Sequence, residues 1–192
     1  LRVYLDYAAL SPRLAGLALA SGDSAPVDAF LAEYSNSYLG QRLERTWVNL
    51  LAREERWADV VRYYNPNNST ATLSCYAPQA RLHDGDLSAM TEVADLWNVS
   101  RSQPNDCDPV FEAWLSADGL TPDIAWQRFR KTLDAGNNPL ASYIVKLMPP
   151  QEARFAQRFL DVDRNPRALV NVDAFSDAAP QTKETVLYGL RQ

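Results

Sequence analysis

Apolar side chains recur at intervals of three and four along almost the whole 192-residue chain, which is the spacing of an amphipathic α-helix. One such stripe lies within residues 27–34, a second covers 39–51, and later ones occupy 57–64, 87–97 and 110–115. Glycine occurs only seven times, and Ala and Leu are abundant while β-branched residues are sparse, which favours helix over sheet. The sequence therefore predicts an all-α protein.

Three glycine turns suggest how the helices are arranged. Gly85, Gly119 and Gly136 each follow an apolar stripe and look like left-handed helix caps. They are 34 and then 17 residues apart, and a helix with its turn takes about 17 residues, so the spacing matches solenoids of paired helices. The full tetratricopeptide pattern is missing. We therefore expect irregular stacked helical hairpins, with later helices beginning at the prolines of 138–139, 149–150, 165–166 and 179–180.

Charge and hydropathy exclude some partners. The net charge of −5 comes from 19 basic and 24 acidic residues, so the chain is a poor match for the phosphate backbone of nucleic acid. No apolar run reaches the roughly 18 residues of a membrane span. The chain opens at Leu1 inside an apolar helical pattern, without an initiator Met, and we expect it to be a mature or excised segment.

The two cysteines lie in different settings. Cys75 falls in a helical pattern, and Cys107 lies in the polar, proline-containing corner SRSQPNDCDPVF at residues 100–111. A tetrahedral metal site needs more ligands than two cysteines and the single His83, so we expect no metal and no cofactor. Two interpretations stay open on these grounds: buried free thiols, or one disulfide that closes a loop of about 33 residues. A disulfide would indicate an oxidising compartment, either periplasmic or extracellular.

At this corner the chain resembles the helical ring domain of the soluble lytic murein transglycosylases of Gram-negative bacteria. The resemblance covers nearly the whole chain in order, and the corner is its most specific part. It is carried by the following segments: YLDYAAL (4–10), RLERTWVNLLAREERWADVVRYYNP (42–66), EVADLWNVSRSQPNDCDPVF (92–111), LDAGNNPLASYIVKLMPP (133–150) and DRNPRALVNVDAF (163–175).

The resemblance implies a fold, a compartment and a role. The fold would be an irregular right-handed α-superhelix of stacked hairpins, one segment over residues 1–192 that forms a fragment of a larger ring. The family keeps cysteines at both matching positions, which implies a Cys75–Cys107 disulfide and a periplasmic protein. The parent enzyme would cleave the MurNAc–GlcNAc bond of peptidoglycan. This segment would support the catalytic domain and guide glycan strands, without a cofactor.

No catalytic residue is predicted in the chain itself. In the family a glutamate followed by serine, in a lysozyme-like domain, acts as the acid, and a Gly-Leu-Met-Gln stretch follows it. Neither motif occurs here, so we expect that domain to be absent from the chain. Other candidates have simpler interpretations: Glu54–Glu55 as a solvated turn, His83 as a helix end, and Asp161 and Asp163 as a helix end or cap. No ligand-binding residue is identified. The alternatives are a tetratricopeptide-like protein-interaction solenoid and a self-contained enzyme.

Three further expectations can be checked directly. Trp47, Trp57, Trp97 and Trp114 lie on apolar stripes and should pack in the core, whereas the pair Tyr63–Tyr64 should be exposed. Asp106 or Asn105 should cap the helix that follows the corner. The ends of the segment should expose apolar side chains and favour self-association, namely Leu1, Val3 and Leu5 at one end and Val186, Leu187 and Leu190 at the other.

Overall fold

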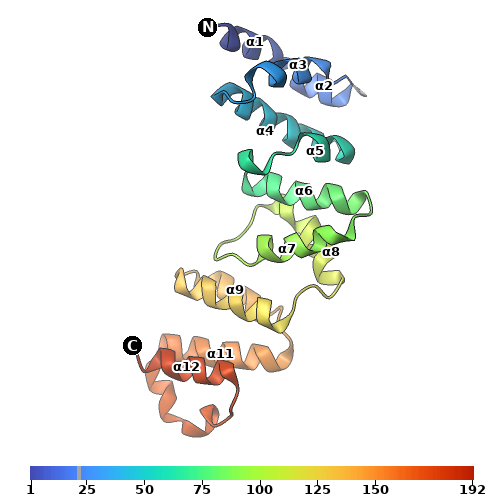
Figure 1. Ribbon diagram of the computed structural model, residues 1–192. Coiled ribbons are helices and arrows are strands. Elements are labelled where there is room, and N and C mark those ends of the chain that lie inside the picture. The colour runs from blue at the N-terminus through green and yellow to red at the C-terminus, as the bar shows by residue number, and fades with distance from the viewer. Residues whose placement is uncertain (21–22) are drawn as a thin grey trace. The chain divides into compact units, whose positions relative to one another are not determined.

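The computed structural model describes residues 1–20 and 23–192 of the protein, and these contain helices and no strand. The predicted all-α class is therefore confirmed (Figure 1). The α-helices are α1 (Arg2–Leu10), α2 (Leu14–Leu19), α3 (Ala25–Tyr34), α4 (Tyr38–Arg53), α5 (Trp57–Tyr63), α6 (Ala71–His83), α7 (Met90–Trp97), α8 (Asp108–Ser116), α9 (Pro122–Asp134), α10 (Asn138–Val145), α11 (Pro150–Arg164) and α12 (Pro180–Gly189). Short 3₁₀ turns are η1 (Ser11–Arg13), η2 (Pro66–Asn68), η3 (Leu87–Ala89), η4 (Asn105–Cys107), η5 (Pro166–Val170) and η6 (Val172–Phe175).

The chain divides into two compact units. Unit 1 contains residues 1–96 and 103–117, and unit 2 contains residues 97–102 and 118–192. Consecutive helices pack as hairpins inside each unit: α4 on α5 and α5 on α6 in unit 1, α9 on α10 and α11 on α12 in unit 2. The chain thus leaves unit 1 at the end of α7 and returns to it within the corner that contains Cys107.

Two of the three predicted glycine turns are confirmed. Gly85 follows α6 with φ +85° and Gly136 follows α9 with φ +72°, in the left-handed region where glycine carries no steric penalty. The prediction for Gly119 is wrong, because the left-handed residue of that turn is Asp118, with φ +54°. Aspartate tolerates this conformation better than most residues, since its short side chain can bond locally.

Proline starts several helices, as predicted, and is tolerated inside one. Pro occupies the first turn of α10, α11 and α12, where its missing N–H leaves no bond unmade. Pro78, in contrast, lies within α6, which continues from Ala71 to His83. The helix thus continues past a residue that cannot donate a hydrogen bond to the carbonyl of Ser74.

The core of unit 1 is built around α4. Leu43, Trp47 and Leu51 follow each other at helical spacing on one face of α4, and all three are fully buried. The hairpin between α3 and α4 is tight at Gly40, because a Cβ atom there would lie 1.9 Å from the backbone oxygen of Tyr34. Only a residue without a side chain allows the two helices to approach this closely.

The core of unit 2 is an aromatic cluster between α9, α11 and α12. Phe129 and Phe159 are fully buried and their rings meet edge to face, with centroids 5.8 Å apart. Trp126 and Tyr188 flank this pair. Arg130 lies over the Phe159 ring at 3.9 Å and donates from Nε to Glu184 Oε1 at 2.8 Å, which joins α9 to α12. Such pairs add to the free energy of burial because their geometry matches the ring quadrupole.

The predictions for the tryptophans are confirmed, and the prediction for the pair Tyr63–Tyr64 is wrong. Trp47, Trp97 and Trp114 are buried, and Trp57 is half-buried and packs against the core. Tyr64, which we expected to be exposed, is half-buried, and Tyr63 is buried, with its hydroxyl donating to Asp28 Oδ1 at 2.6 Å. A tyrosine can be buried in this way when its hydroxyl finds an acceptor at the rim of the core.

The predicted apolar side chains at the ends are mostly exposed. Leu1, which precedes α1, and Leu5, within α1, are exposed. At the other end, Leu187 and Leu190 are exposed. Val3 and Val186 are half-buried. Over residues 1–20 and 23–192, none of the helices combines the length and the apolar character needed to span a bilayer.

Candidate functional site

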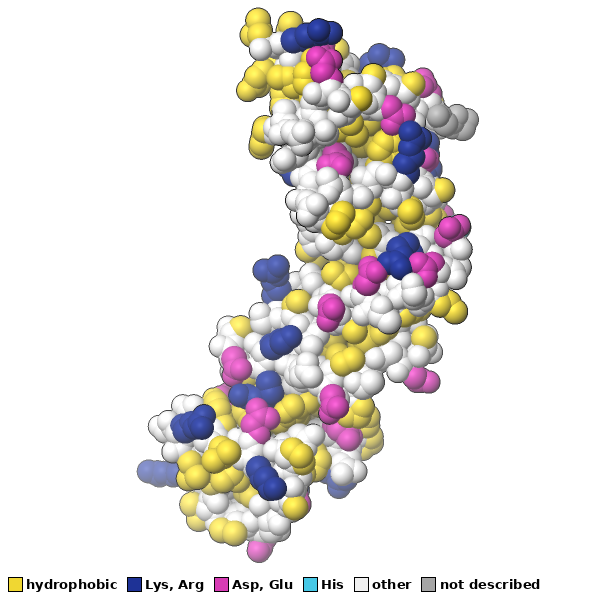
Figure 2. Space-filling model, viewed as in Figure 1, with side chains coloured by type: hydrophobic (Ala, Val, Ile, Leu, Met, Phe, Trp, Pro, Cys, Tyr) yellow, Lys and Arg dark blue, Asp and Glu magenta, His cyan; other side chains and the backbone are white. Residues whose placement is uncertain are grey.

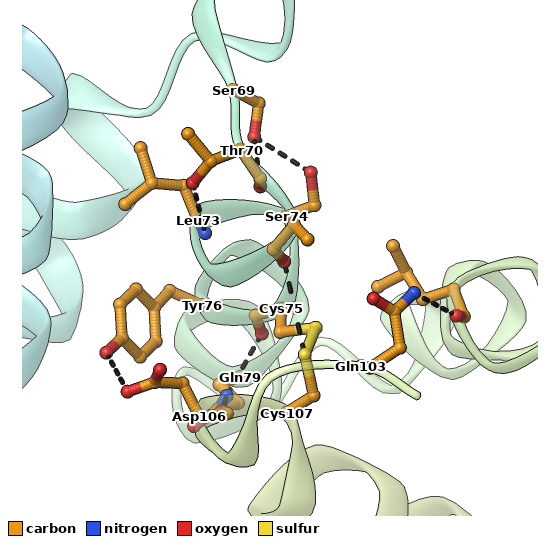
Figure 3. Close-up of a disulfide and its surroundings, with 12 residues drawn as sticks. Ser69, Thr70, Leu73, Ser74, Cys75, Tyr76, Gln79, Gln103, Asp106 and Cys107 are labelled. Carbon is orange, nitrogen blue, oxygen red and sulfur yellow. Dashed lines mark hydrogen bonds between the residues drawn. A yellow bond between two sulfur atoms is a disulfide. The ribbon is translucent and has the colours of Figure 1, made fainter. Parts of the chain in front are cut away.

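The corner that contains Cys107 is the most constrained feature of unit 1. Cys75 comes from α6 and Cys107 from η4, both side chains are fully buried, and their sulfur atoms lie 2.05 Å apart, so the two form a disulfide (Figure 3). The bond joins positions 32 residues apart in the sequence. In the chain-entropy model a loop of this length stabilises the folded state by about 3–4 kcal/mol.

Polar contacts reinforce the disulfide from both sides. The hydroxyl of Tyr76 donates to Asp106 Oδ1 at 2.6 Å, and Gln79 Nε2 donates to the backbone oxygen of Asp106 at 2.8 Å (Figure 3). Gln103 Nε2 donates to the backbone oxygen of Leu96 at 2.7 Å, which ties the corner to the end of α7. Side-chain amides thus donate hydrogen bonds to backbone carbonyls at the corner that have no partner within a helix.

The predicted cap at Asp106 or Asn105 is wrong. The 3₁₀ turn η4 leads directly into α8, whose N-cap residue is Cys107, and no side chain bonds to the first N–H groups of α8. Asp106 accepts from Tyr76 instead. Burial of the Tyr76 ring and the negative charge of Asp106 raise the pKa of Tyr76 to about 12, with the nearby Arg53 acting in the opposite direction.

The neighbouring loop, residues 97–102, belongs to unit 2 and is held by hydrogen bonds from α9. Arg128 is buried, donates to the backbone oxygens of Val99 and Arg101 at 3.3 and 3.4 Å, and stacks 4.2 Å from the Trp97 ring. Lys131 Nζ donates to the backbone oxygen of Asn98 at 2.9 Å. Burial lowers the pKa of Arg128 to about 10. A buried guanidinium is costly unless its donors are used, and here they bond to loop carbonyls.

The candidate acids are not brought together into a reactive group. Glu54 and Glu55 form the turn between α4 and α5, with Glu55 at φ +55°, and both are exposed. His83 ends α6, as expected, and lies against Trp57. Asp163 accepts from the Tyr188 hydroxyl, and Asp161 accepts from Gln157 at 3.0 Å. Each of these carboxylates except the turn pair thus has a structural partner.

A cluster of metal ligands and a basic stripe are two further features that would indicate a binding partner. Apart from the two residues 21 and 22, no three side chains of His, Cys, Asp or Glu are grouped so that they could hold a metal ion. Acidic and basic side chains are interspersed over the visible face of each unit (Figure 2). Nothing on that face resembles the basic stripe with which proteins follow a nucleic-acid backbone.

The fold resembles that of one class of protein, the soluble lytic transglycosylases. A solved structure of lytic transglycosylase Slt from Pseudomonas aeruginosa, an inactive variant, matches 98% of this chain with a TM-score of 0.82 and 30% sequence identity. The 70-kDa soluble lytic transglycosylase of Escherichia coli matches 97% of the chain with a TM-score of 0.77 at 23% identity. The predicted all-α superhelical fold is confirmed by these matches.

Among individual proteins, the chain is similar to the soluble lytic murein transglycosylases of two enteric bacteria. The protein from Escherichia coli strain K12 is 26% identical over 143 residues, and that from Salmonella typhimurium is 29% identical over 129 residues. These matches cover 74% and 67% of the chain. The resemblance inferred from the corner is therefore confirmed. No protein-family model matches the chain.

The matches cover only part of each relative. The chain spans 22% of the Escherichia coli protein, 20% of the Salmonella protein and 30% of the solved Pseudomonas chain. The likeness therefore concerns one portion of these proteins and not their whole length.

Proposed function

We propose that this chain is a non-catalytic segment of the helical ring of a periplasmic soluble lytic transglycosylase. In this role it supports the catalytic domain of the parent enzyme, which acts on peptidoglycan, and guides glycan strands. Residues 1–192 act as one helical segment of that ring, and the lysozyme-like catalytic domain is not part of it. The proposal rests chiefly on the match of 98% of the chain to 30% of the solved Pseudomonas transglycosylase.

The chemistry of the described side chains supports the non-catalytic part of the proposal. A lytic reaction on a glycosidic bond needs an acid with a suitably tuned pKa beside a substrate cleft. The acids discussed above either lie in an exposed turn or bond to tyrosine, arginine or amide groups. Among the carboxyl groups of residues 1–20 and 23–192 whose pKa is shifted, none has a raised pKa. The pKa values of Asp86 and Asp177 are both lowered, by hydrogen bonds and by neighbouring arginines.

The disulfide supports the periplasmic part. Structural disulfides form and persist in oxidising compartments, and the names of the relatives place their action on murein. A buried pair such as Cys75–Cys107 would not serve as a redox catalyst, because neither sulfur is accessible to an exchanging thiol.

The test has two parts on the same purified chain. Incubation with murein sacculi should release no anhydro-muropeptides, while co-sedimentation should show that the chain binds the sacculi. Release of anhydro-muropeptides would show that the chain itself is an enzyme. Absence of sacculus binding together with capture of one defined protein partner would favour the alternative, a tetratricopeptide-like interaction solenoid.

A further inference from the structure

A polar hollow of about 320 Å³ lies in unit 1 between α4 and the first turn of α6. Arg45, Thr46, Asn49 and Arg53 line it from α4, and Thr70, the N-cap residue of α6, lines it from the other side. Leu50 and Leu73 add apolar surface. Figure 3 shows Thr70 and Leu73 at the start of α6, close to Ser69.

The charge of this hollow differs from that of three others of the molecule. Its lining includes two guanidinium groups and no carboxylate. In the hollow between α1 and α3, Asp6 and Glu33 balance two arginines. In the hollow beside the loop 98–101, Asp134 lies with Arg101 and Lys131. The hollow beside Trp57 includes three acids. In a chain with a net charge of −5, the α4–α6 hollow is thus a local concentration of positive charge.

Neither guanidinium group forms an ion pair with a carboxylate within the part of the chain that the structure describes. Arg45 donates to the neutral amide oxygen of Asn68, and Arg53 interacts with the hydroxyl of Tyr76. Glu44, on the same helix, accepts from the amides of Asn68 and Asn65 at 2.5 and 3.5 Å. Because a guanidinium has five N–H donors, both arginines keep donors for a ligand.

The geometry of α4 spaces these donors evenly. Arg45, Asn49 and Arg53 are each four residues apart and so lie on one face of the helix. At a rise of about 1.5 Å per residue, the two arginine Cα atoms are about 12 Å apart, with the Asn49 amide between them. The N-terminal turn of α6 adds the positive end of a helix dipole to the same hollow.

We propose that this hollow binds a peptide that carries two carboxylates, one at each guanidinium, with the peptide backbone against Asn49. Guanidinium and carboxylate groups form paired N–H···O bonds, which favours a carboxylate over a sugar hydroxyl at these two positions. Resting on the proposed function, the ligand is the acidic stem peptide of murein. The segment would then hold peptide side branches and not only the glycan strand.

The experiment titrates the whole chain with γ-D-glutamyl-diaminopimelate, whose three carboxylates can supply one to each guanidinium. Binding is followed by calorimetry or by amide chemical shifts at low salt. The variant R45Q/R53Q should bind at least about tenfold more weakly, because it loses both charge-assisted contacts. The control R154Q/R167Q changes the net charge equally at two exposed arginines of unit 2 and should bind like the wild type. The peptide with its carboxylates amidated should not bind.

Further measurements keep the proposal falsifiable. R53K keeps the charge and the fold while removing the planar fork, so it should weaken binding less than R53Q does. Equal binding by wild type and R45Q/R53Q, with unchanged helical circular dichroism, would overturn the proposal. So would tighter binding of inorganic phosphate than of γ-D-glutamyl-diaminopimelate.

Sacculus binding separates this inference from the proposed function. If the chain binds sacculi but R45Q/R53Q binds them equally well, the hollow is not the peptide site and the proposed function stands. If γ-D-glutamyl-diaminopimelate binds at the hollow but sacculi are not bound, the hollow is a carboxylate site and the proposed function fails.

Discussion

The two halves of the segment 97–107 are held in different ways. Residues 103–107 lie in unit 1, where the Cys75–Cys107 disulfide joins η4 to α6. Residues 97–102 lie in unit 2, where Arg128 and Lys131 of α9 bond to loop carbonyls. A disulfide acts mainly on the unfolded chain and responds to reductant, whereas the arginine acts in the folded state by satisfying carbonyls that would otherwise be buried unbonded. Two adjacent stretches of irregular chain therefore differ in what destabilises them: reductant weakens the hold on residues 103–107 but not the hold on residues 97–102.

The largest effect is expected from removing the disulfide. C75A/C107A should lower the free energy of unfolding of unit 1 by about 3–4 kcal/mol, because the unfolded chain regains the entropy of an open loop. Thermal unfolding followed by circular dichroism measures this, with helix content at 20 °C expected to remain near that of the wild type.

Reduction of the wild type provides the matched control for that variant. Wild type in strong reductant should unfold at the same midpoint as C75A/C107A, and the variant should not respond to reductant. Unchanged melting and unchanged proteolysis around residues 98–110 after reduction would mean that the bond has no structural role. Free thiols titrated in the native protein would contradict the disulfide itself.

The next largest effect should come from Arg128. R128M fills a similar volume but leaves the carbonyls of Val99 and Arg101 without their donors, so it should destabilise unit 2 by about 2 kcal/mol. Hydrogen exchange should show faster opening of residues 97–102 and α9, with protection of α4 and α6 unchanged. Equal acceleration in α4 would show that the two halves of the corner do not act separately. R154M, at an exposed position, is the control.

A smaller effect, dependent on pH, is expected from Tyr76. Its pKa is raised in the folded state to about 12, so its contribution to stability is complete below pH 10 and is lost as the pH rises from about 10 to 12. Y76F should lower stability by about 1.5 kcal/mol at neutral pH, since the bond to the Asp106 carboxylate is removed. The difference between wild type and Y76F should then shrink across that pH range in urea unfolding. A constant difference would contradict the assignment, and Y38F, at an exposed tyrosine, should show none.

The smallest effect is self-association through the exposed apolar side chains of α1. Tyr4 and Leu5 are 66% and 64% exposed, and we expect weak dimerisation with a Kd on the order of 100 μM or higher. Sedimentation velocity over a concentration series measures this. L5E should abolish the association, whereas L87E, at a similarly exposed leucine of η3, should leave it intact. A monomer at millimolar concentration would contradict the expectation.

The fold class and the helix starts could be predicted because they depend on local features, namely apolar spacing and proline in first turns. The capping of α8 could not, because Asp106 finds its partner Tyr76 thirty residues away, and no local pattern reports such a contact. The burial of Tyr63 was missed for the same reason, since its acceptor Asp28 is 35 residues away. Asp118 took the place of Gly119 as the left-handed residue because aspartate can also adopt that conformation.

The candidate hollow also depends on contacts between distant parts of the chain, which sequence patterns do not report. Arg45, Asn49 and Arg53 lie on one face of α4, which sequence spacing could have revealed, but their common hollow exists only because α6 places its first turn beside them. The arginine–carbonyl contacts of the loop 97–102 have no signal in the sequence, since any backbone carbonyl can be the acceptor.

The close approach of the two helices at Gly40 restricts which residues position 40 can accept. Since a Cβ atom there would overlap the backbone oxygen of Tyr34, even alanine cannot be accommodated by a change of rotamer, and the two helices would have to separate. A saturation library selected for folded protein should therefore keep a single codon family at position 40, while the exposed position 41 next to it varies freely. Any redesigned sequence that keeps this hairpin must therefore keep glycine at position 40.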